Sequence, residues 1–542
     1  MSIRTNPLNH VERQLMNYRK IVVGLSLCLL SLASSAASKA QLQIVLVVDG
    51  LRPDSITEAN TPNLYKLQKQ GVWFDNTHAV FPTVTRVNSA SFSTGTYPAR
   101  HGVMGNNMFV SAVDANAAFG NDDFKNLLKL DSATSGQMLT VPGLAEILNA
   151  RDKKFVVLSS GSTGSAMLLA PKATRGIGTL INPDFFPGEK VAYPDTVSRA
   201  ILDKFPVAPK KGGAKSRYDD SVNWSMEVLR EYVLPTLKPD VLFVWMTEPD
   251  HIQHGLGIGG KDALEAIHND DRQIGLLLQK LQALGLGEKT NVMVVSDHGF
   301  SQTVADINVE RFLIDANLMS ANKTGDLVIA SSGQSVALHV KDHDAAQIAA
   351  IVKALQQQPW CGVVFTRGST KRAAHEGTVD GTFALELAHL GGHDRSPDIV
   401  FTFPWSSIVN IDGVPGGDYN VVSGNGVSGP VANGTANHGG IGPWTIRNTM
   451  LANGPDFKRG AIVRTSSSNV DVAPTLMHLM GFDDVVRSMD GRALLEALAN
   501  GPDQEQVSQE VRTHRVSNGT YAASLQESRV GGKRYIDKGW RD

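Results

Sequence analysis

Cysteine is scarce in this chain of 542 residues, which contains only Cys28 and Cys361. Cys28 lies in an N-terminal segment that we expect to be removed, so no intramolecular disulfide could form in the remaining protein. Stability must then come from the apolar core and from bound metal. Cys361 follows Trp360, and we expect a buried, inert thiol there rather than a catalytic one.

An excess of one charge is also missing. The chain has 51 Lys and Arg residues against 53 Asp and Glu residues, and no long run of one sign occurs. A surface for binding nucleic acid is therefore not indicated. The length exceeds what one compact core usually needs, which favours two domains or one domain with a cap.

No apolar run beyond residue 40 is long enough to span a membrane. At the N-terminus, the basic residues Arg13, Arg19 and Lys20 precede an apolar run over 21–30, and small residues continue to Ala40. This arrangement is typical of a secretory signal peptide. We predict a signal over residues 1–40, cleaved after Ala40 or Ala36, and a periplasmic or secreted protein. An uncleaved membrane anchor is the alternative.

Apolar, β-branched runs alternate with helical patterns after the signal. This alternation predicts an α/β fold with a mostly parallel sheet sandwiched by helices. We expect a catalytic domain over 41–500, a smaller α/β cap or subdomain inserted at about 305–395, and a C-terminal tail over 501–542. Strands are predicted at 42–48, 155–158, 241–246, 291–296, 335–340 and 398–403, and helices at 61–70, 142–150, 222–233, 263–284 and 344–355.

Four short segments have the composition of metal sites. Three of their carboxylates follow predicted strands closely, and ligands gather at the carboxyl edge of such a sheet. Asp250 and His254 are four residues apart, which places both on one side of a helical turn. Carboxylate with imidazole suits zinc, manganese or iron, and the ligands suffice for two divalent ions. The segments are Val48-Asp49-Gly50, Glu248-Pro249-Asp250 running to His254, Asp297-His298-Gly299 and Asn437-His438-Gly439.

A hydroxyl-rich turn, Phe81-Pro82-Thr83-Val84-Thr85, lies between the first two segments. A hydroxyl becomes an effective nucleophile when a metal lowers its pKa. Residues 88–95 are expected to begin a helix, whose N-terminal amides would favour a phosphate oxygen. From these residues alone, both Thr83 and Thr85 are candidates for the nucleophile.

Taken in order, these motifs resemble the alkaline phosphatase superfamily, nearest its type I phosphodiesterase and nucleotide pyrophosphatase branch. The resemblance covers residues 43 to about 500. It implies that Thr85, the second threonine of Pro82-Thr83-Val84-Thr85, is the nucleophile, and that Asn106 contacts the phosphoryl oxygen. It also implies two Zn²⁺ ions, although another divalent transition metal is an alternative. One ion would be bound by Asp49, Thr85, Asp297 and His298, and the other by Asp250, His254 and His438.

Two positions decide whether nucleotides fit. The family typically has an aromatic residue after the nucleophile, where this chain has Arg86. Trp245 is a candidate for a second aromatic wall around a base, while Arg86 could stack on a base or pair with a second anionic group. His393 is an alternative metal ligand. The run 159–165 lacks the Gly-Lys-Ser/Thr ending of a phosphate loop, so we predict a turn there.

These observations favour an exported two-zinc hydrolase that cleaves phosphodiester or pyrophosphate bonds through a phosphothreonine on Thr85. Its partner would be a small phosphate ester, with nucleotides among the candidates. A phosphomonoesterase or a phosphonate hydrolase of the same superfamily is the alternative. A formylglycine sulfatase is disfavoured because no cysteine occupies the nucleophile position. A catalytically silent binding protein on this fold is the alternative from another class.

Overall fold

The computed structural model describes residues 38–542, except for 206–208, 210–211, 323–324 and 423–434. The predicted signal peptide lies almost entirely outside these residues. Residues 39–542 form one compact unit. Among the described helices, none combines the length and the apolar character needed to cross a lipid bilayer.

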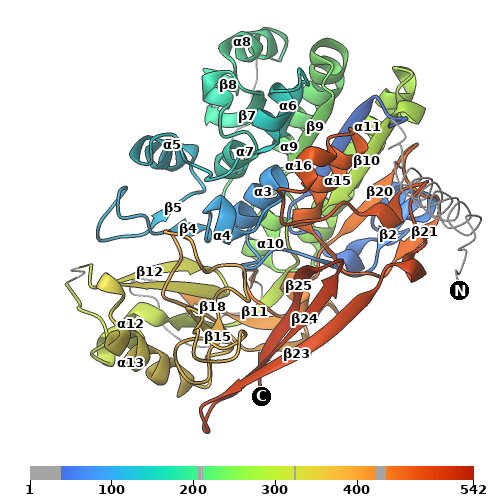
Figure 1. Ribbon diagram of the computed structural model, residues 1–542. Helices are drawn as coiled ribbons and strands as arrows, with labels where there is room; N and C mark the ends of the chain where they lie inside the picture. The colour runs from blue at the N-terminus through green and yellow to red at the C-terminus, as the bar shows by residue number, and fades with distance from the viewer. Residues whose placement is uncertain (1–37, 206–208, 210–211, 323–324, 423–434) are drawn as a thin grey trace, which may run out of the picture. The chain divides into compact units, whose positions relative to one another are not determined.

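A nine-stranded sheet forms the centre of this unit, with β1 between β10 and β9 (Figure 1). Both neighbours run parallel to β1, and β6 and β7 continue the parallel arrangement. Only β20 and β8 run antiparallel to their neighbours. The expected mostly parallel sheet is therefore confirmed. The strands, in order across the sheet, are β21 (Ala461–Val463), β2 (Val72–Phe74), β20 (Met450–Asn453), β10 (Thr290–Val295), β1 (Leu42–Val48), β9 (Val241–Met246), β6 (Phe155–Ser159), β7 (Thr179–Phe186) and β8 (Lys190–Tyr193).

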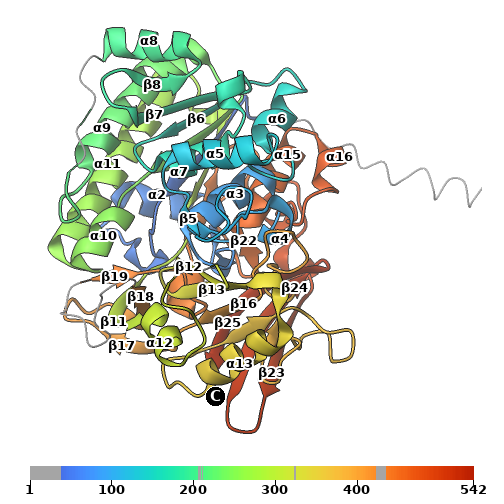
Figure 2. The same ribbon diagram turned by 90° about the vertical axis from the view of Figure 1, so that its left-hand side faces the viewer.

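Helices cover both faces of this sheet, as Figure 2 shows for α9 and α11 on one side and α5 and α7 on the other. Alternate residues of β1 belong to two separate apolar cores, with Val45 and Val47 in one and Ile44 and Leu46 in the other. A strand buried on both faces requires this continuous apolar sequence. One face is covered by α2 (Pro62–Gln70), α8 (Asp195–Lys204), α9 (Asp219–Val228) and α11 (Lys261–Ala283), and the other by α3 (Thr85–Thr94), α5 (Phe124–Ala133), α6 (Leu144–Asn149), α7 (Thr163–Leu169) and α15 (Val472–Leu479).

A second region, residues 301–437, contains two smaller sheets and its own apolar core. The predicted strand at 398–403 forms here, as β16, antiparallel to β13 and β14 rather than in the central sheet. An apolar run of this length does not reveal which sheet will receive it. The five-stranded sheet has the order β12 (Leu327–Ser332), β13 (Ser335–Val340), β16 (Ile399–Thr402), β14 (Val364–Thr366) and β15 (Phe383–Ala384), with helices α12 (Val309–Asp315) and α13 (Ala345–Gln356). The four-stranded sheet has the order β17 (Trp405–Val409), β18 (Pro415–Val422), β11 (Ser301–Asn308) and β19 (Ala436–Asn437).

The C-terminal residues form a three-stranded antiparallel sheet of β23 (Gln509–Ser517), β24 (Ala522–Val530) and β25 (Lys533–Arg541) (Figure 1). The hydroxyl of buried Tyr521 donates to the carbonyl oxygen of Gly362 at 2.6 Å, which fixes this sheet against the second region. Cys361, the neighbour of Gly362, is buried, and burial raises the pKa of its thiol to about 12. The expected burial of this thiol is confirmed.

Candidate active site

Three adjacent strands of the central sheet deliver the three carboxylates of the site. Asp49 follows β1 directly, while Asp297 follows β10 and Asp250 follows β9 within a few residues. The backbone N–H of Gly50 donates to Asp297 Oδ1 at 3.1 Å. The N–H of Asp250 donates to the carbonyl oxygen of Asp49 at 3.0 Å. The carboxyl edges of the strands are thus joined at the site, as expected for a parallel sheet.

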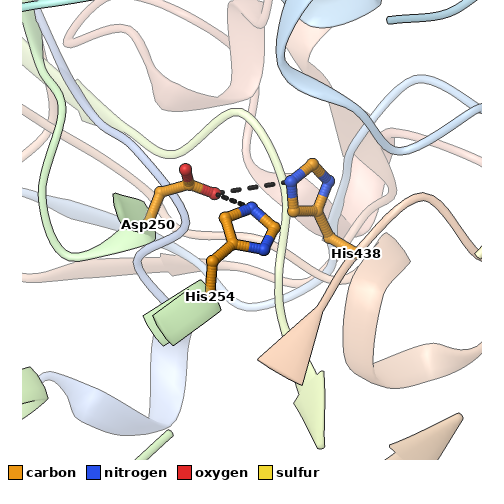
Figure 3. Close-up of side chains that lie close together, drawn as sticks. All are labelled: Asp250, His254 and His438. Atoms are coloured by element: carbon orange, nitrogen blue, oxygen red, sulfur yellow. Dashed lines mark ion pairs between the residues drawn. The ribbon is translucent and has the colours of Figure 1, made fainter. Parts of the chain in front are cut away.

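Asp250 lies between two imidazoles in the first ligand group. It is the first residue of α10 (Asp250–Leu256), and His254 lies one turn later. The Nε2 atoms of His254 and His438 are each 3.4 Å from Asp250 Oδ1, as Figure 3 shows. His438 directly follows β19, which belongs to the second region and pairs with β11. Two parts of the chain that are distant in sequence therefore complete this group.

His298 is the centre of a second ligand group. Its Nε2 lies 3.1 Å from Asp297 Oδ2 and 3.6 Å from Asp49 Oδ1. The hydroxyl oxygen of Thr85 is 3.4 Å from the same nitrogen. Asp250 Oδ1 is 3.8 Å away, so the two groups are neighbours. The seven expected ligands therefore lie close together, around Asp250 and His298.

Backbone carbonyls orient all three imidazoles. His254 Nδ1 lies 3.2 Å from the carbonyl oxygen of Ala436. His438 Nδ1 lies 3.0 Å from the carbonyl oxygen of Thr83, and His298 Nδ1 lies 2.9 Å from the carbonyl oxygen of Gly299. A carbonyl oxygen only accepts, so Nδ1 carries the proton and Nε2 presents its lone pair to the site. This is the tautomer that a metal ligand requires.

The carboxylates fit a metal for a second reason. Asp49 Oδ1, Asp250 Oδ1 and Asp297 Oδ2 are buried, and none has a hydrogen-bond partner among the described residues. Burying such oxygens without a donor or cation is costly. Ligands about 2.0 Å from a tetrahedral ion lie about 3.3 Å apart, which is close to the 3.1–3.6 Å separations within the two groups. The donor set therefore suits two divalent ions.

The pKa values in the site diverge as expected for crowded acids and imidazoles. Burial and the neighbouring carboxylates of Asp250 and Asp297 raise the pKa of Asp49 well above its usual range. Burial also opposes ionisation of Asp250, but the surrounding imidazoles hold the pKa of this carboxyl below its usual range. Burial and the neighbouring His298 lower the pKa of His438. The site thus holds His438 neutral and Asp250 charged, the forms that bind cations.

The two candidate nucleophiles have different surroundings. The hydroxyl of Thr83 donates to the carbonyl oxygen of Gly440 at 2.8 Å and accepts from the N–H of Gly439 at 3.1 Å. Thr85 instead directs its hydroxyl to His298 from the first turn of α3. The helix begins at Thr85, earlier than the expected start at residue 88. The nucleophile candidate is therefore part of the helix N-terminus.

Asn106 lies beside the start of this helix. Its side-chain oxygen accepts the backbone N–H of Arg86 at 3.1 Å, which leaves the amide NH₂ to donate elsewhere. Arg86 is half-buried, and its Nε is shielded from solvent without a hydrogen-bond partner among the described residues. The structure therefore brings Thr85, Asn106 and Arg86 together.

Trp245 does not fit the expected role as a wall around a nucleotide base. The side chain is 0% exposed, so its ring offers no face to a ligand. Its indole N–H instead donates to Asp49 Oδ2 at 2.9 Å. Trp245 lies on β9, and β9 is buried on both faces by helices, which explains the correction. The sequence does not reveal the hydrogen bond to Asp49, because an aromatic residue shortly before a metal-binding motif is also typical of a residue that stacks on a ligand.

His393, the alternative metal ligand, is not brought to either group. Its Nε2 lies 3.1 Å from the Thr140 hydroxyl, and its Nδ1 accepts the N–H of Arg395 at 2.9 Å. In the run over 159–165, residues 160–162 form the predicted turn after β6, whereas residues 163–165 already belong to α7. One contact had no signal in the sequence at all: the hydroxyl of Ser332, in the second region, accepts the backbone N–H of Asn106 at 3.0 Å.

Several proteins resemble this chain in sequence. Bovine ectonucleotide pyrophosphatase/phosphodiesterase family member 3 is 24% identical over 266 residues, covering 48% of this chain and 25% of the bovine protein. Venom phosphodiesterase 2 of Crotalus adamanteus is 24% identical over 48% of this chain and 27% of its own length. Human bis(5'-adenosyl)-triphosphatase is 25% identical over 50% of this chain and 51% of its own length. This chain thus matches between a quarter and a half of each relative.

Solved structures support the same fold. Murine ectonucleotide pyrophosphatase/phosphodiesterase 5 superposes with a TM-score of 0.54 at 17% identity, covering 86% of this chain and 100% of that chain. An inactive variant of that murine protein in complex with AMP gives a TM-score of 0.53 over 81% of this chain and 95% of that chain. The model of the family described as "Type I phosphodiesterase / nucleotide pyrophosphatase" matches residues 43–410. The chain therefore belongs to the type I phosphodiesterase/nucleotide pyrophosphatase family, within the alkaline phosphatase superfamily.

Proposed function

We propose that this protein is a metal-dependent hydrolase that cleaves phosphodiester or pyrophosphate bonds, with Thr85 as the nucleophile. The observation that carries this proposal is the position of the Thr85 hydroxyl, 3.4 Å from His298 Nε2 at the N-terminus of α3. Family membership and the phosphodiesterase and pyrophosphatase activities named for the relatives support the reaction class. They give no support to a monoesterase, a phosphonate hydrolase or a silent binding protein.

The proposed cofactors are two Zn²⁺ ions. One would be held by Asp49, Thr85, Asp297 and His298, and the other by Asp250, His254 and His438. Imidazole and carboxylate donors with tetrahedral spacing favour zinc over calcium or magnesium. When bound, the ions would lower the pKa of the nucleophilic hydroxyl and offset negative charge on the leaving oxygen.

The proposed reaction consists of two displacements at phosphorus, and different residues of the chain act in them. In the first, Thr85 Oγ1 forms a bond to phosphorus and the bond to the leaving oxygen breaks, which gives a phosphothreonine. The amide NH₂ of Asn106 would donate to a nonbridging oxygen, together with backbone N–H groups at the start of α3 other than that of Arg86, which donates to Asn106 Oδ1. In the second, water attacks phosphorus from the side that the leaving group vacated, and Thr85 regains its hydroxyl.

Arg86 is the proposed contact for a second anionic group of the substrate. Its half-buried guanidinium follows the nucleophile directly, and its Nε has no hydrogen-bond partner within the described part of the chain. A buried donor without an acceptor is costly, so a phosphate or similar oxyanion would stabilise it. Because Trp245 is buried, it cannot stack on a nucleotide base, and of the two residues considered for stacking only Arg86 is left. We therefore propose pyrophosphates and diesters with a second negative charge as preferred substrates. Nucleotides are included, as AMP bound to the murine relative suggests.

A comparison of substrates tests this function. We expect turnover of bis-p-nitrophenyl phosphate and of a nucleotide p-nitrophenyl ester, with p-nitrophenyl phosphate the poorest of the three. Arg86→Gln should raise KM about tenfold for a pyrophosphate substrate and change little for bis-p-nitrophenyl phosphate, which has no second charge. The proposed class would be refuted by fastest turnover of the monoester.

Export is part of the proposal. The signal-like sequence over residues 1–40 supports it, as does the similarity to venom phosphodiesterases. Mass spectrometry of the protein recovered from its cells should find a new N-terminus after Ala36 or Ala40. Retention of residues 1–36 on the mature protein would contradict cleavage.

A further inference from the structure

The turn between β12 and β13 reaches from the second region into the candidate active site. These two strands pair antiparallel, with Ser332 opposite Ser335 and only Gly333 and Gln334 between them. Gly333 has φ +64, a conformation that glycine adopts without strain in a two-residue hairpin loop. The turn is therefore short and stiff, so it can hold the residues that contact it in fixed positions.

One side of this turn contacts the residue proposed to bind the phosphoryl oxygen. The buried hydroxyl of Ser332 accepts the backbone N–H of Asn106 at 3.0 Å. The carbonyl oxygen of Asn106 accepts the N–H of Asn121 at 3.1 Å, and its side-chain oxygen accepts the N–H of Arg86. Asn106 is thus held on three sides, and only the bond from Ser332 comes from the second region.

The other side of the turn contacts a candidate metal ligand. The N–H of Gln334 donates to the carbonyl oxygen of His438 at 3.0 Å. A Cβ atom at Gly333 would collide with that same carbonyl oxygen, and one at Gly439 would collide with the carbonyl oxygen of Ser332. The two backbones therefore touch, and their separation cannot change without moving His438.

We propose that the β12–β13 turn is a brace that fixes the spacing between the Asn106 amide and the His438 imidazole, with Ser332 as a positioning residue. This inference rests on the function proposed above, because it assigns Asn106 to the phosphoryl oxygen. Residues in the second region that never touch substrate would then set the rate. Hydrogen bonds of 3.0 Å at both ends favour this role, since misplacement of a catalytic group by about 1 Å is costly.

The test begins with Ser332→Ala assayed on bis-p-nitrophenyl phosphate. Loss of the acceptor leaves the Asn106 N–H without a partner, and we expect kcat to fall about tenfold. KM and the zinc content should stay at the wild-type values. Ser331→Ala, a neighbouring serine of the same strand that is half-buried, is the matched control and should behave as wild type.

A double-mutant cycle separates positioning from a general structural effect. In an Asn106→Ala background, Ser332→Ala should cause no further loss, because the group that it positions is already gone. An equal loss in both backgrounds, or a Ser332→Ala variant that matches Ser331→Ala, would overturn the brace. Activity that survives in Thr85→Ala would instead overturn the proposed function, so the two failures are distinguishable.

The His438 end of the brace is tested without turnover. Gly333→Ala should weaken zinc binding roughly tenfold in competition with a chelating dye, because the new methyl group displaces the His438 backbone. Unchanged zinc affinity in the folded variant would refute this end of the brace. If Gly333→Ala does not fold, the double-mutant cycle decides the proposal.

Discussion

The indole N–H of Trp245 donates a 2.9 Å hydrogen bond to the carboxylate of Asp49 inside the central sheet. Trp245 lies on β9 and Asp49 follows β1, and the two strands are parallel neighbours. The bond engages Oδ2, while Oδ1 faces His298 Nε2. Trp245 therefore orients the carboxylate so that one oxygen is directed to the metal group.

Trp245 does not contact the substrate, but loss of its indole donor should impair metal binding or catalysis. We predict that Trp245→Phe lowers metal affinity or kcat roughly ten- to a hundredfold, the usual effect of losing a group that orients a metal ligand. Zinc titration and steady-state kinetics measure the two quantities. Trp224→Phe is the matched control, since Trp224 is buried and its Nε1 makes no hydrogen bond within the described residues. Equal effects of the two substitutions would show that lost volume, not the bond to Asp49, matters.

Neutralising Asp49 should separate stability from metal binding. Burial and repulsion by Asp250 and Asp297 raise the pKa of Asp49, so its charge destabilises the metal-free protein. Asparagine retains an oxygen for the Trp245 N–H and removes the charge. We predict that Asp49→Asn raises the melting temperature in a chelator by about 2 °C or more. Added zinc should raise it less than in wild type. A lower melting temperature than wild type in the chelator would contradict this account of the charges.

The two threonines of the turn should respond differently to loss of the hydroxyl. Thr85→Ala is predicted to lower kcat/KM at least about a thousandfold, as expected for a nucleophile. Thr85→Ser should retain much of the activity. Thr83→Val loses two buried hydrogen bonds, and its main effect should be a lower free energy of unfolding, by about 2 kcal/mol.

The stereochemical course tests the same nucleophile independently. Two in-line displacements retain configuration at phosphorus, whereas direct attack by water inverts it. A chiral thiophosphate ester should therefore give a product of retained configuration. Inversion, or wild-type turnover by Thr85→Ala, would exclude the covalent intermediate on Thr85.

The sequence predicted the carboxylates and imidazoles of the site because each lies in a local pattern. Asp49 ends an apolar run, and Asp250 and His254 are one helical turn apart, so short-range geometry places them. Contacts between residues that are far apart in the sequence leave no such local pattern. Ser332 lies far along the chain from Asn106, and nothing around it distinguishes it from other strand serines. Trp245 was misread because burial on both faces of β9 depends on helices elsewhere in the chain.

The sequence also could not predict which sheet each strand joins. The apolar run at Ile399–Thr402 was correctly expected to form a strand, but it pairs antiparallel within the second region. Periodicity describes how a strand is buried and does not name its partners. The partner is chosen by packing of the second core, to which Val400 and Phe401 belong.

A buried carboxyl at the contact between the central region and the C-terminal sheet should make stability depend on pH. Asp471 is buried and accepts hydrogen bonds from the N–H of Arg492, at 2.8 Å, and from the hydroxyl of Tyr535, at 3.2 Å. Burial nevertheless raises the pKa of Asp471 to about 6, from 3.8. The folded protein therefore binds a proton at a higher pH than the unfolded chain. Ionisation of Asp471 destabilises the fold fully above pH 6, and this effect disappears as the pH falls toward 3.8.

We predict that wild type gains about 2.5 kcal/mol relative to Asp471→Asn between pH 7.5 and pH 4, because the carboxyl takes up its proton near pH 6 in the folded protein and only near pH 3.8 in the unfolded chain. Denaturant unfolding of both proteins in a chelator measures this difference and removes the separate effect of metal release. The asparagine variant loses hydrogen bonds at every pH, so only the change of the difference with pH reports the carboxyl. A difference that stays constant with pH, or that grows in favour of the variant as the pH falls, would mean that Asp471 is ionised in the folded protein throughout this range.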